Sequence, residues 1–205
     1  MSPGPPGQNL KVSALVWYVI ATVTGAVRML IQPSRRPAMI VLFTVALAVL
    51  HLGYESLTGG VQSHHLLNRR DMPALSNWLG LFTLPLLGVI VAARVRSGAP
   101  WKPLWLALVG AAVYGAMLAG AFELGASGVT QALFFGLFAL AVQLPLYRAE
   151  HVLGFVVGMT FTFGAVLPTI IGAVFATLSL ALRLAMRGVV HVWRWLARPA
   201  GRPAL

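Results

Sequence analysis

The chain has 205 residues, of which 59% are hydrophobic and only 9% are charged, and its formal net charge is +11. A soluble domain carries about 25% charged residues, so this composition excludes an ordinary soluble protein and predicts contact with acyl chains. The basic residues lie between apolar runs, which favours anionic lipid headgroups over nucleic acid as their partners, and the absence of Cys excludes disulfides and thiolate metal sites.

The predicted elements begin with a Pro- and Gly-rich N-terminus, residues 1–9, which we expect to be disordered. A helix needs about 20 mostly apolar residues to cross the hydrocarbon core of a bilayer. Apolar runs of about this length follow one another between residues 10 and 182, which predicts a transmembrane helical domain there. The first five spans are expected at residues 10–31, 37–55, 73–94, 103–122 and 128–147.

The charge-free run 152–182 would be about 46 Å long as a straight helix, well beyond a core of about 30 Å. Pro168 lies at its middle, where it removes a backbone donor and bends or breaks a helix. The run is either one tilted, kinked helix, which we favour, or two short spans joined by a tight turn. Gly154 and Gly158 form a small-xxx-small face on which a neighbouring helix can pack closely.

Basic residues recur every three or four positions after this run, which places them on one helical face. Together with Trp193 and Trp195 they predict an amphipathic helix over residues 183–198 that lies in the headgroup layer, followed by a disordered tail at 199–205. Its expected partners are anionic lipid headgroups, or a partner subunit. The basic positions are Arg183, Arg187, His191, Arg194 and Arg198. The predicted fold class is therefore all-α, a polytopic transmembrane helical bundle of six spans, or seven, plus a C-terminal amphipathic basic helix.

The distribution of basic residues predicts the orientation of the chain, because short basic loops favour the cytoplasm. The first, third and fifth loops are basic and are expected on the cytoplasmic side. The second loop, with His64 and His65, is then extracytoplasmic, although Arg69 and Arg70 in the same loop favour the opposite side. We expect a multi-pass membrane protein, located in the inner membrane if the source is bacterial.

The scarce polar residues gather in segment 51–78. His51 and Glu55 are four residues apart, hence on one helical face at the mouth of the second span. Ser63, His64 and His65 follow a Gly-Gly pair that allows a sharp turn. Four further polar residues are expected at the same membrane face and would line or complete a site: Tyr54, Asp71, Asn77 and Glu123.

Imidazole and carboxylate are the ligands that zinc, iron or copper can use in a chain without thiolates. The hypothesis is a divalent transition metal held by His51, His64 and His65. Glu55 and Asp71 would compete for the fourth position or serve as catalytic acid–base groups. Structural alternatives stay open for single residues: His64 and His65 at the headgroup level, Asp71 or Ser76 as helix caps, and Glu55 paired with Arg69 or Arg70.

Ser63, His64, His65 and Asp71 are similar in residue type to the zinc site of the alkaline ceramidase and adiponectin-receptor superfamily. That resemblance implies hydrolysis of a lipid amide at zinc held by three His. It covers about 30 residues, and the His pair that the family takes from its last span has no counterpart in 152–182.

Three functions fit the sequence. The first is a membrane-embedded enzyme, hydrolase-like and metal-dependent, that acts on a lipid or another apolar substrate. The second is a non-catalytic subunit of a larger membrane complex. The third is a small transporter, which the lack of an internal repeat and the few charges within the spans make less favourable.

Overall fold

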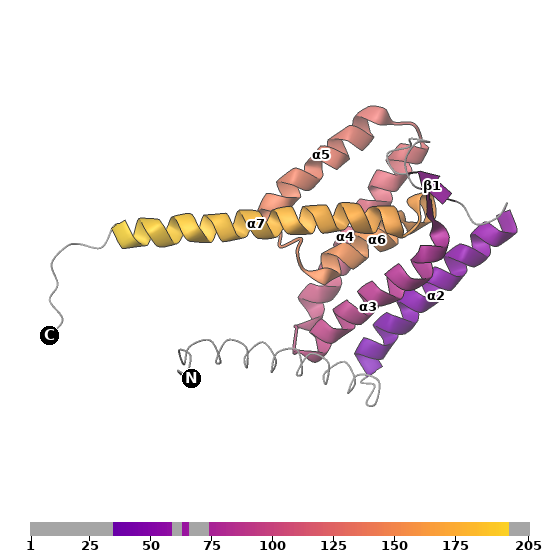
Figure 1. Ribbon diagram of the computed structural model, residues 1–205, viewed down its shortest axis with the longest axis horizontal. Coiled ribbons are helices and arrows are strands. Elements are labelled where there is room, and N and C mark those ends of the chain that lie inside the picture. The colour runs from indigo at the N-terminus through magenta and orange to yellow at the C-terminus, as the bar shows by residue number, and fades with distance from the viewer. Residues whose placement is uncertain (1–34, 59–62, 66–73, 197–205) are drawn as a thin grey trace, which may run out of the picture.

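The computed structural model describes residues 35–58, 63–65 and 74–196 (Figure 1). The predicted first span at 10–31 and the predicted disordered ends at 1–9 and 199–205 lie outside the described residues. The elements follow in the order α2 (Arg35–Thr58), β1 (Ser63–His65), β2 (Ala74–Ser76), η2 (Asn77–Leu79), α3 (Gly80–Arg96), α4 (Trp101–Glu123), α5 (Ser127–Gln143), α6 (Ala149–Phe163) and α7 (Val166–Leu196).

A helical bundle is confirmed, but six or seven spans are not. Within the described ranges, four helical segments are long and apolar enough to cross a membrane: Arg35–Thr58, Asn77–Arg96, Trp101–Glu123 and Val166–His191. The two remaining helices, α5 and α6, are apolar but have only 17 and 15 residues. At 1.5 Å per residue they are about 26 and 23 Å long, shorter than a typical hydrocarbon core.

The predicted single kinked helix over 152–182 is wrong, and the chain breaks into α6 and α7. The break is at Gly164 rather than at Pro168. Gly164 has φ of 69° and ψ of −178°, a backbone conformation essentially restricted to glycine. Pro168 lies in the first turn of α7, where helical N–H groups have no partner within the helix and a missing donor is tolerated.

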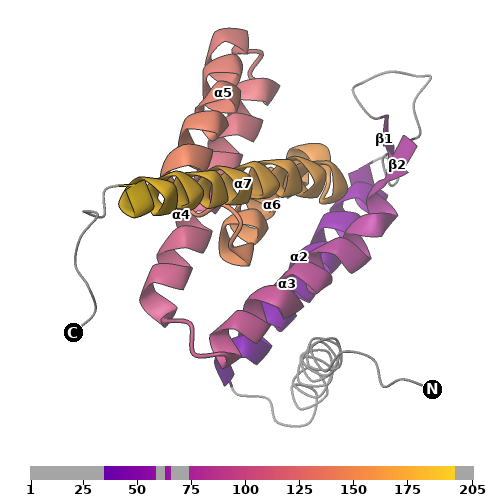
Figure 2. The same ribbon diagram turned by 60° about the vertical axis from the view of Figure 1, so that its left-hand side comes forward.

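The second half of α7 is the basic segment that the sequence predicts as a separate helix. In the structure α7 runs without a break from Val166 to Leu196, so the segment continues the helix that precedes it. In both views α7 crosses α4 and α6, and its C-terminal end extends beyond the other helices (Figures 1 and 2). Whether this end lies in the headgroup layer stays a prediction.

Glycines lie in the two most extensive helix–helix contacts, α4 with α6 and α2 with α3. A Cβ at Gly154 or Gly158 of α6 would overlap backbone atoms of α4, and a Cβ at Gly88 of α3 would overlap Thr44 of α2. The predicted small-xxx-small face is therefore confirmed, and its partner is α4. Close backbone approach of this kind is what associates helices in lipid, where apolar burial contributes little between them.

Contacts between helix ends define two ends of the bundle. At the basic end, Arg36 at the start of α2 lies over the Trp101 ring at the start of α4, 5.5 Å from its centroid. At the opposite end, the strand pair β1–β2 adjoins η2, and Thr162 of α6 donates a hydrogen bond to Glu123 of α4 at 2.7 Å. The polar end is therefore the end at which α2, α4 and α6 finish.

Candidate functional site

The buried polar cluster at the polar end consists of His51, Glu55 and Asn77. His51 and Glu55 are 3% and 7% exposed, and Asn77 is 3% exposed. The His51 Nε2 atom lies 3.7 Å from Glu55 Oε1. The Asn77 side chain donates a hydrogen bond from Nδ2 to the same oxygen. The cluster thus joins α2 to η2 and removes three polar side chains from the surrounding lipid.

Local structure explains how the three side chains meet. His51 and Glu55 are one helical turn apart on α2, as the sequence predicts. Asn77 opens η2, whose first turn is capped by Ser76: the Ser76 hydroxyl accepts a hydrogen bond from the Trp78 backbone N–H at 3.4 Å. The cap confirms one of the structural alternatives for Ser76, and it fixes the point from which Asn77 reaches Glu55.

The α6–α7 break supports the cluster from the other side. A Cβ at Gly164 would overlap the side-chain amide of Asn77, so the glycine makes room for that amide. The Phe161 ring of α6 packs edge-on against His51, with ring centroids 5.5 Å apart. Phe161 and Gly164 are contributions that no pattern in the sequence indicates, because they come from an apolar helix about 100 residues later in the chain.

The Glu55 carboxylate has two oxygens in unequal surroundings. Oε1 accepts the Asn77 amide and faces His51, whereas Oε2 is buried and has no hydrogen-bond partner among the described residues. Arg69 and Arg70, the alternative partners of Glu55, lie outside the described residues. A buried polar atom without a partner is costly, and such atoms in native proteins call for a structural or catalytic reason.

The other residues predicted for the site are distributed as follows. Tyr54 is 58% exposed and contacts Phe161 with its ring edge, so it borders the cluster from outside. Glu123 shares the polar end but is exposed and accepts a hydrogen bond from Thr162, apart from the cluster. Ser63 and His64 pair with Ser76 and Leu75 through the backbone of β1 and β2.

The structure describes only part of the predicted metal site. Within the described residues, no group of three His, Asp or Glu side chains is arranged to hold a metal ion. The backbone pairing of His65 with Ala74 brings β1 next to η2, hence to the same end of the bundle as His51. Asp71 lies outside the described ranges. Metal ligation by His51, His64 and His65 therefore stays a prediction.

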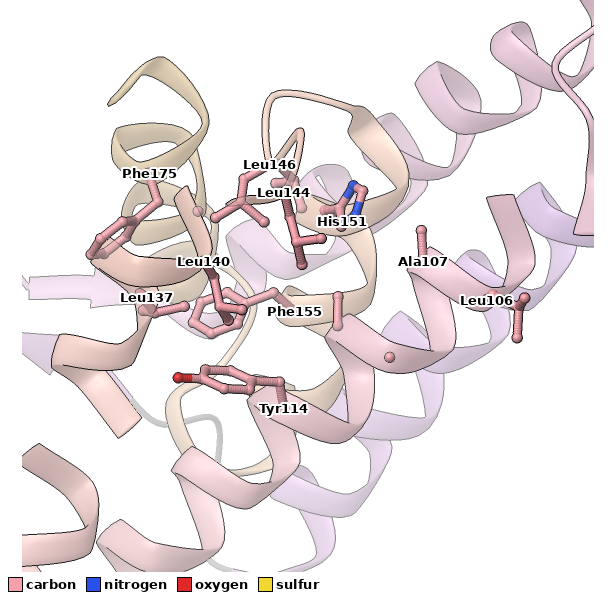
Figure 3. A pocket seen from close by; sticks show the side chains of 14 residues that line it. Leu106, Ala107, Tyr114, Leu137, Leu140, Leu144, Leu146, His151, Phe155 and Phe175 are labelled. Atoms are coloured by element: carbon pink, nitrogen blue, oxygen red, sulfur yellow. The ribbon is translucent and has the colours of Figure 1, made fainter. Parts of the chain in front are cut away.

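A second feature of the described bundle is an apolar cavity of about 450 Å³ between α4, α5, α6 and α7. Its walls are mainly leucine, alanine and phenylalanine side chains (Figure 3). Two polar side chains reach it, Tyr114 and His151, and the Tyr114 hydroxyl donates a hydrogen bond to the Leu133 carbonyl at 2.6 Å. The volume falls within the range of small-molecule sites, about 300–1,000 Å³.

The cluster and the cavity lie on different faces of α6. Val152 and Phe155 line the cavity, whereas Phe161 points to His51. At about 100° per residue, Phe161 is about 120° around the helix from Phe155 and about 180° from Val152. The two features are therefore separate sites.

Comparison with protein-family models, with curated proteins and with solved structures found no match for this chain. Fold and composition together define the class: a helical membrane protein with four helices of spanning length in the described part.

Proposed function

We propose that the chain is a multi-pass membrane enzyme that acts on a lipid or another apolar substrate, with Glu55 as its acid–base group. The observation that supports this function is the Glu55 carboxylate, which is buried, held at one oxygen by Asn77 and, among the described residues, without a partner at the other. Ionisable side chains inside membrane helices are costly and mark functional sites in most membrane proteins. A free carboxylate oxygen beside an imidazole is suited to accept a proton.

The reaction that this group best supports is hydrolysis of a polar bond in a lipid. Oε2 accepts one proton from water while the water oxygen bonds to the electrophilic carbon or phosphorus, and the proton then passes to the leaving group as its bond breaks. The His51 Nε2 atom lies 3.7 Å from Oε1 and therefore flanks the oxygen that does not take the proton. Asn77 holds Oε1, which keeps the carboxylate in one orientation.

The experiment compares the wild-type protein with Glu55→Gln, a variant of nearly the same shape that cannot accept the proton. Both proteins are reconstituted in vesicles made from a membrane-lipid extract, and lipid species are quantified over time by mass spectrometry. Loss of a general base lowers rates by about 10²–10⁴-fold. We expect the wild type to consume one lipid class and Glu55→Gln to lose at least about 100-fold of that rate.

Thr58→Val is the matched control, because Thr58 is exposed one turn further along α2. In the described part of the chain its hydroxyl bonds only to its own helix, at the Tyr54 and Glu55 carbonyls. It should keep the wild-type rate. Equal rates for the wild type and Glu55→Gln would contradict the proposal. A wild type that converts no lipid but co-purifies with a fixed second protein would instead support a non-catalytic subunit.

Elemental analysis of the same samples tests the metal hypothesis. One zinc, iron or copper per chain in the wild type, lost in both His51→Ala and His64→Ala, would make the cluster a metal site. The assignment of Glu55 as a metal-independent base would then be wrong.

A further inference from the structure

The apolar cavity between α4, α5, α6 and α7 reaches the basic end of the bundle. Leu144 and Leu146, which follow α5, form part of its wall, and Figure 3 shows His151 beside them. His151 stands at the start of α6, and its buried Nδ1 atom has no hydrogen-bond partner among the described residues. Along α4 the same cavity extends from Leu106 to Tyr114, a distance of about two helical turns. Its interior therefore suits an apolar chain that enters from the basic end.

Arg183 of α7 stands next to this end of the cavity. Its Nη2 atom donates a hydrogen bond to the Gln143 carbonyl at 3.0 Å, and its guanidinium lies over the Tyr147 ring, 5.9 Å from the centroid. In the sequence, Gln143 and Tyr147 lie on either side of Leu144 and Leu146, which line the cavity. The Arg183 Nε atom is buried and has no hydrogen-bond partner in the described part of the chain. Arg183 also lines the surface groove described next, and an anion can reach its guanidinium from that side.

A surface groove continues from Arg183 along α7. It has a volume of about 400 Å³ and is lined by Arg183, Met186, Arg187, Val190, His191 and Arg194. Within the described ranges no carboxylate pairs with any of its three arginines; the described Arg–carboxylate ion pair joins Arg94 and Glu150. Arg183 therefore separates an apolar cavity from a groove with unneutralised positive charge.

We propose that this composite site binds an anionic phospholipid of the leaflet at the basic end of the bundle. One acyl chain occupies the cavity, and the phosphate binds Arg183 with the groove arginines beside it. Arg is suited to phosphate because its planar N–H groups match the phosphate oxygens, and the contact is strengthened by charge. The net negative charge of the headgroup complements the groove. The site lies across α6 from Glu55 and is independent of the proposed enzymatic function.

Two variants test the two halves of the site. Gly110→Phe fills the cavity: Gly110 lines it, and a Cβ there meets nothing within 4 Å, so the backbone of α4 leaves room for the new side chain to begin. Arg187→Gln removes charge from the groove at a residue with no hydrogen bond or ion pair to the rest of the described chain. The controls are Gly120→Phe, also in open space on α4, and Arg35→Gln at the basic end of α2.

Each protein is reconstituted with equal amounts of phosphatidylglycerol and phosphatidylcholine and then purified with its bound lipid. The ratio of the two lipids that remain bound is measured by mass spectrometry. We expect wild type and both controls to retain phosphatidylglycerol preferentially. Losing one charge-assisted contact changes affinity by about tenfold, which is the decrease expected for Arg187→Gln. Gly110→Phe should lower retention of both lipids.

Other outcomes overturn the proposal. Equal retention of the two lipids by the wild type excludes recognition of anionic headgroups. Retention by Gly110→Phe that matches the wild type excludes an acyl chain in the cavity. Arg183→Lys serves as a second head-group variant, since it keeps the charge but loses the planar contact. Glu55→Gln should retain phosphatidylglycerol as the wild type does, so failure of the proposed enzymatic function would leave this result unchanged.

Discussion

Replacing Gly164 by Ala is expected to destabilise the protein by about 2–6 kcal/mol, because two penalties fall on the same residue. The backbone of Gly164 has φ of 69° and ψ of −178°. A side chain in that conformation costs about 1–3 kcal/mol. Its Cβ would also overlap the Asn77 amide, and overpacking a well-packed site costs about 1–3 kcal/mol more. The overlap would also disturb the proposed site, because the displaced Asn77 amide is the group that bonds to Glu55.

The assay is equilibrium unfolding of purified protein in mixed micelles, with helical circular dichroism as the signal. Gly125→Ala is the matched control: Gly125 also has a positive φ, 66°, but a Cβ there meets nothing within 4 Å. It should cost only the backbone term, about 1–2 kcal/mol. In an Asn77→Ala background the cost of Gly164→Ala should fall toward that of the control. Equal costs for the two glycine variants in the wild-type background would refute the reasoning.

Two further predictions follow from the same structure. Ser179 of α7 is fully buried, donates to the Leu144 carbonyl at 2.9 Å and accepts from the Leu146 N–H at 3.2 Å. Ser179→Ala removes both of these hydrogen bonds and leaves the two backbone groups with the 2.9 Å bond between them. It should cost about 1–3 kcal/mol in the same unfolding assay, whereas Thr177→Ala, an exposed residue bonded to its own helix, should cost less than about 0.5 kcal/mol. The chain lacks Cys, so Thr58→Cys and Ser97→Cys introduce single labelling sites at opposite ends of the bundle. The positive-inside rule predicts that an impermeant maleimide labels the first in intact cells and the second only after permeabilisation; the reverse pattern would invert the predicted orientation.

The two proposed sites divide the bundle between them. The polar cluster belongs to α2 and η2, with support from one face of α6. The cavity and the cationic groove belong to α4, α5, α7 and the other face of α6. Because α6 contributes to both, its close glycine contacts with α4 position both sites at once. A substitution that separates α4 from α6 should therefore disturb both functions, whereas changes within one site should leave the other intact.

Part of the candidate site follows from the sequence alone. A continuous apolar run that spans a membrane must be helical, because a helix satisfies its own backbone hydrogen bonds. His51 and Glu55 then meet because residues four apart lie on one face of a helix. The sequence predicts Asn77 at the same membrane face, but its hydrogen bond to Glu55 depends on the β1–β2 pairing and on the cap at Ser76. The sequence also favoured a kink at Pro168, because proline is a strong helix breaker. The structure places the break at Gly164, where the Asn77 amide occupies the space of a side chain.

Composition and the spacing of apolar runs determined that this is a helical membrane protein and where most of its described helices lie. The spacing of Gly154 and Gly158 also predicted the face of α6 that packs against another helix, because only small residues allow two helices to approach closely in lipid. Tertiary structure alone decided which oxygen of Glu55 is held, which glycine breaks the helix, and where the cavity opens. The physical reason is that leucine and phenylalanine serve equally well against lipid, against another helix or around a cavity, so their order in the chain does not distinguish among these surroundings.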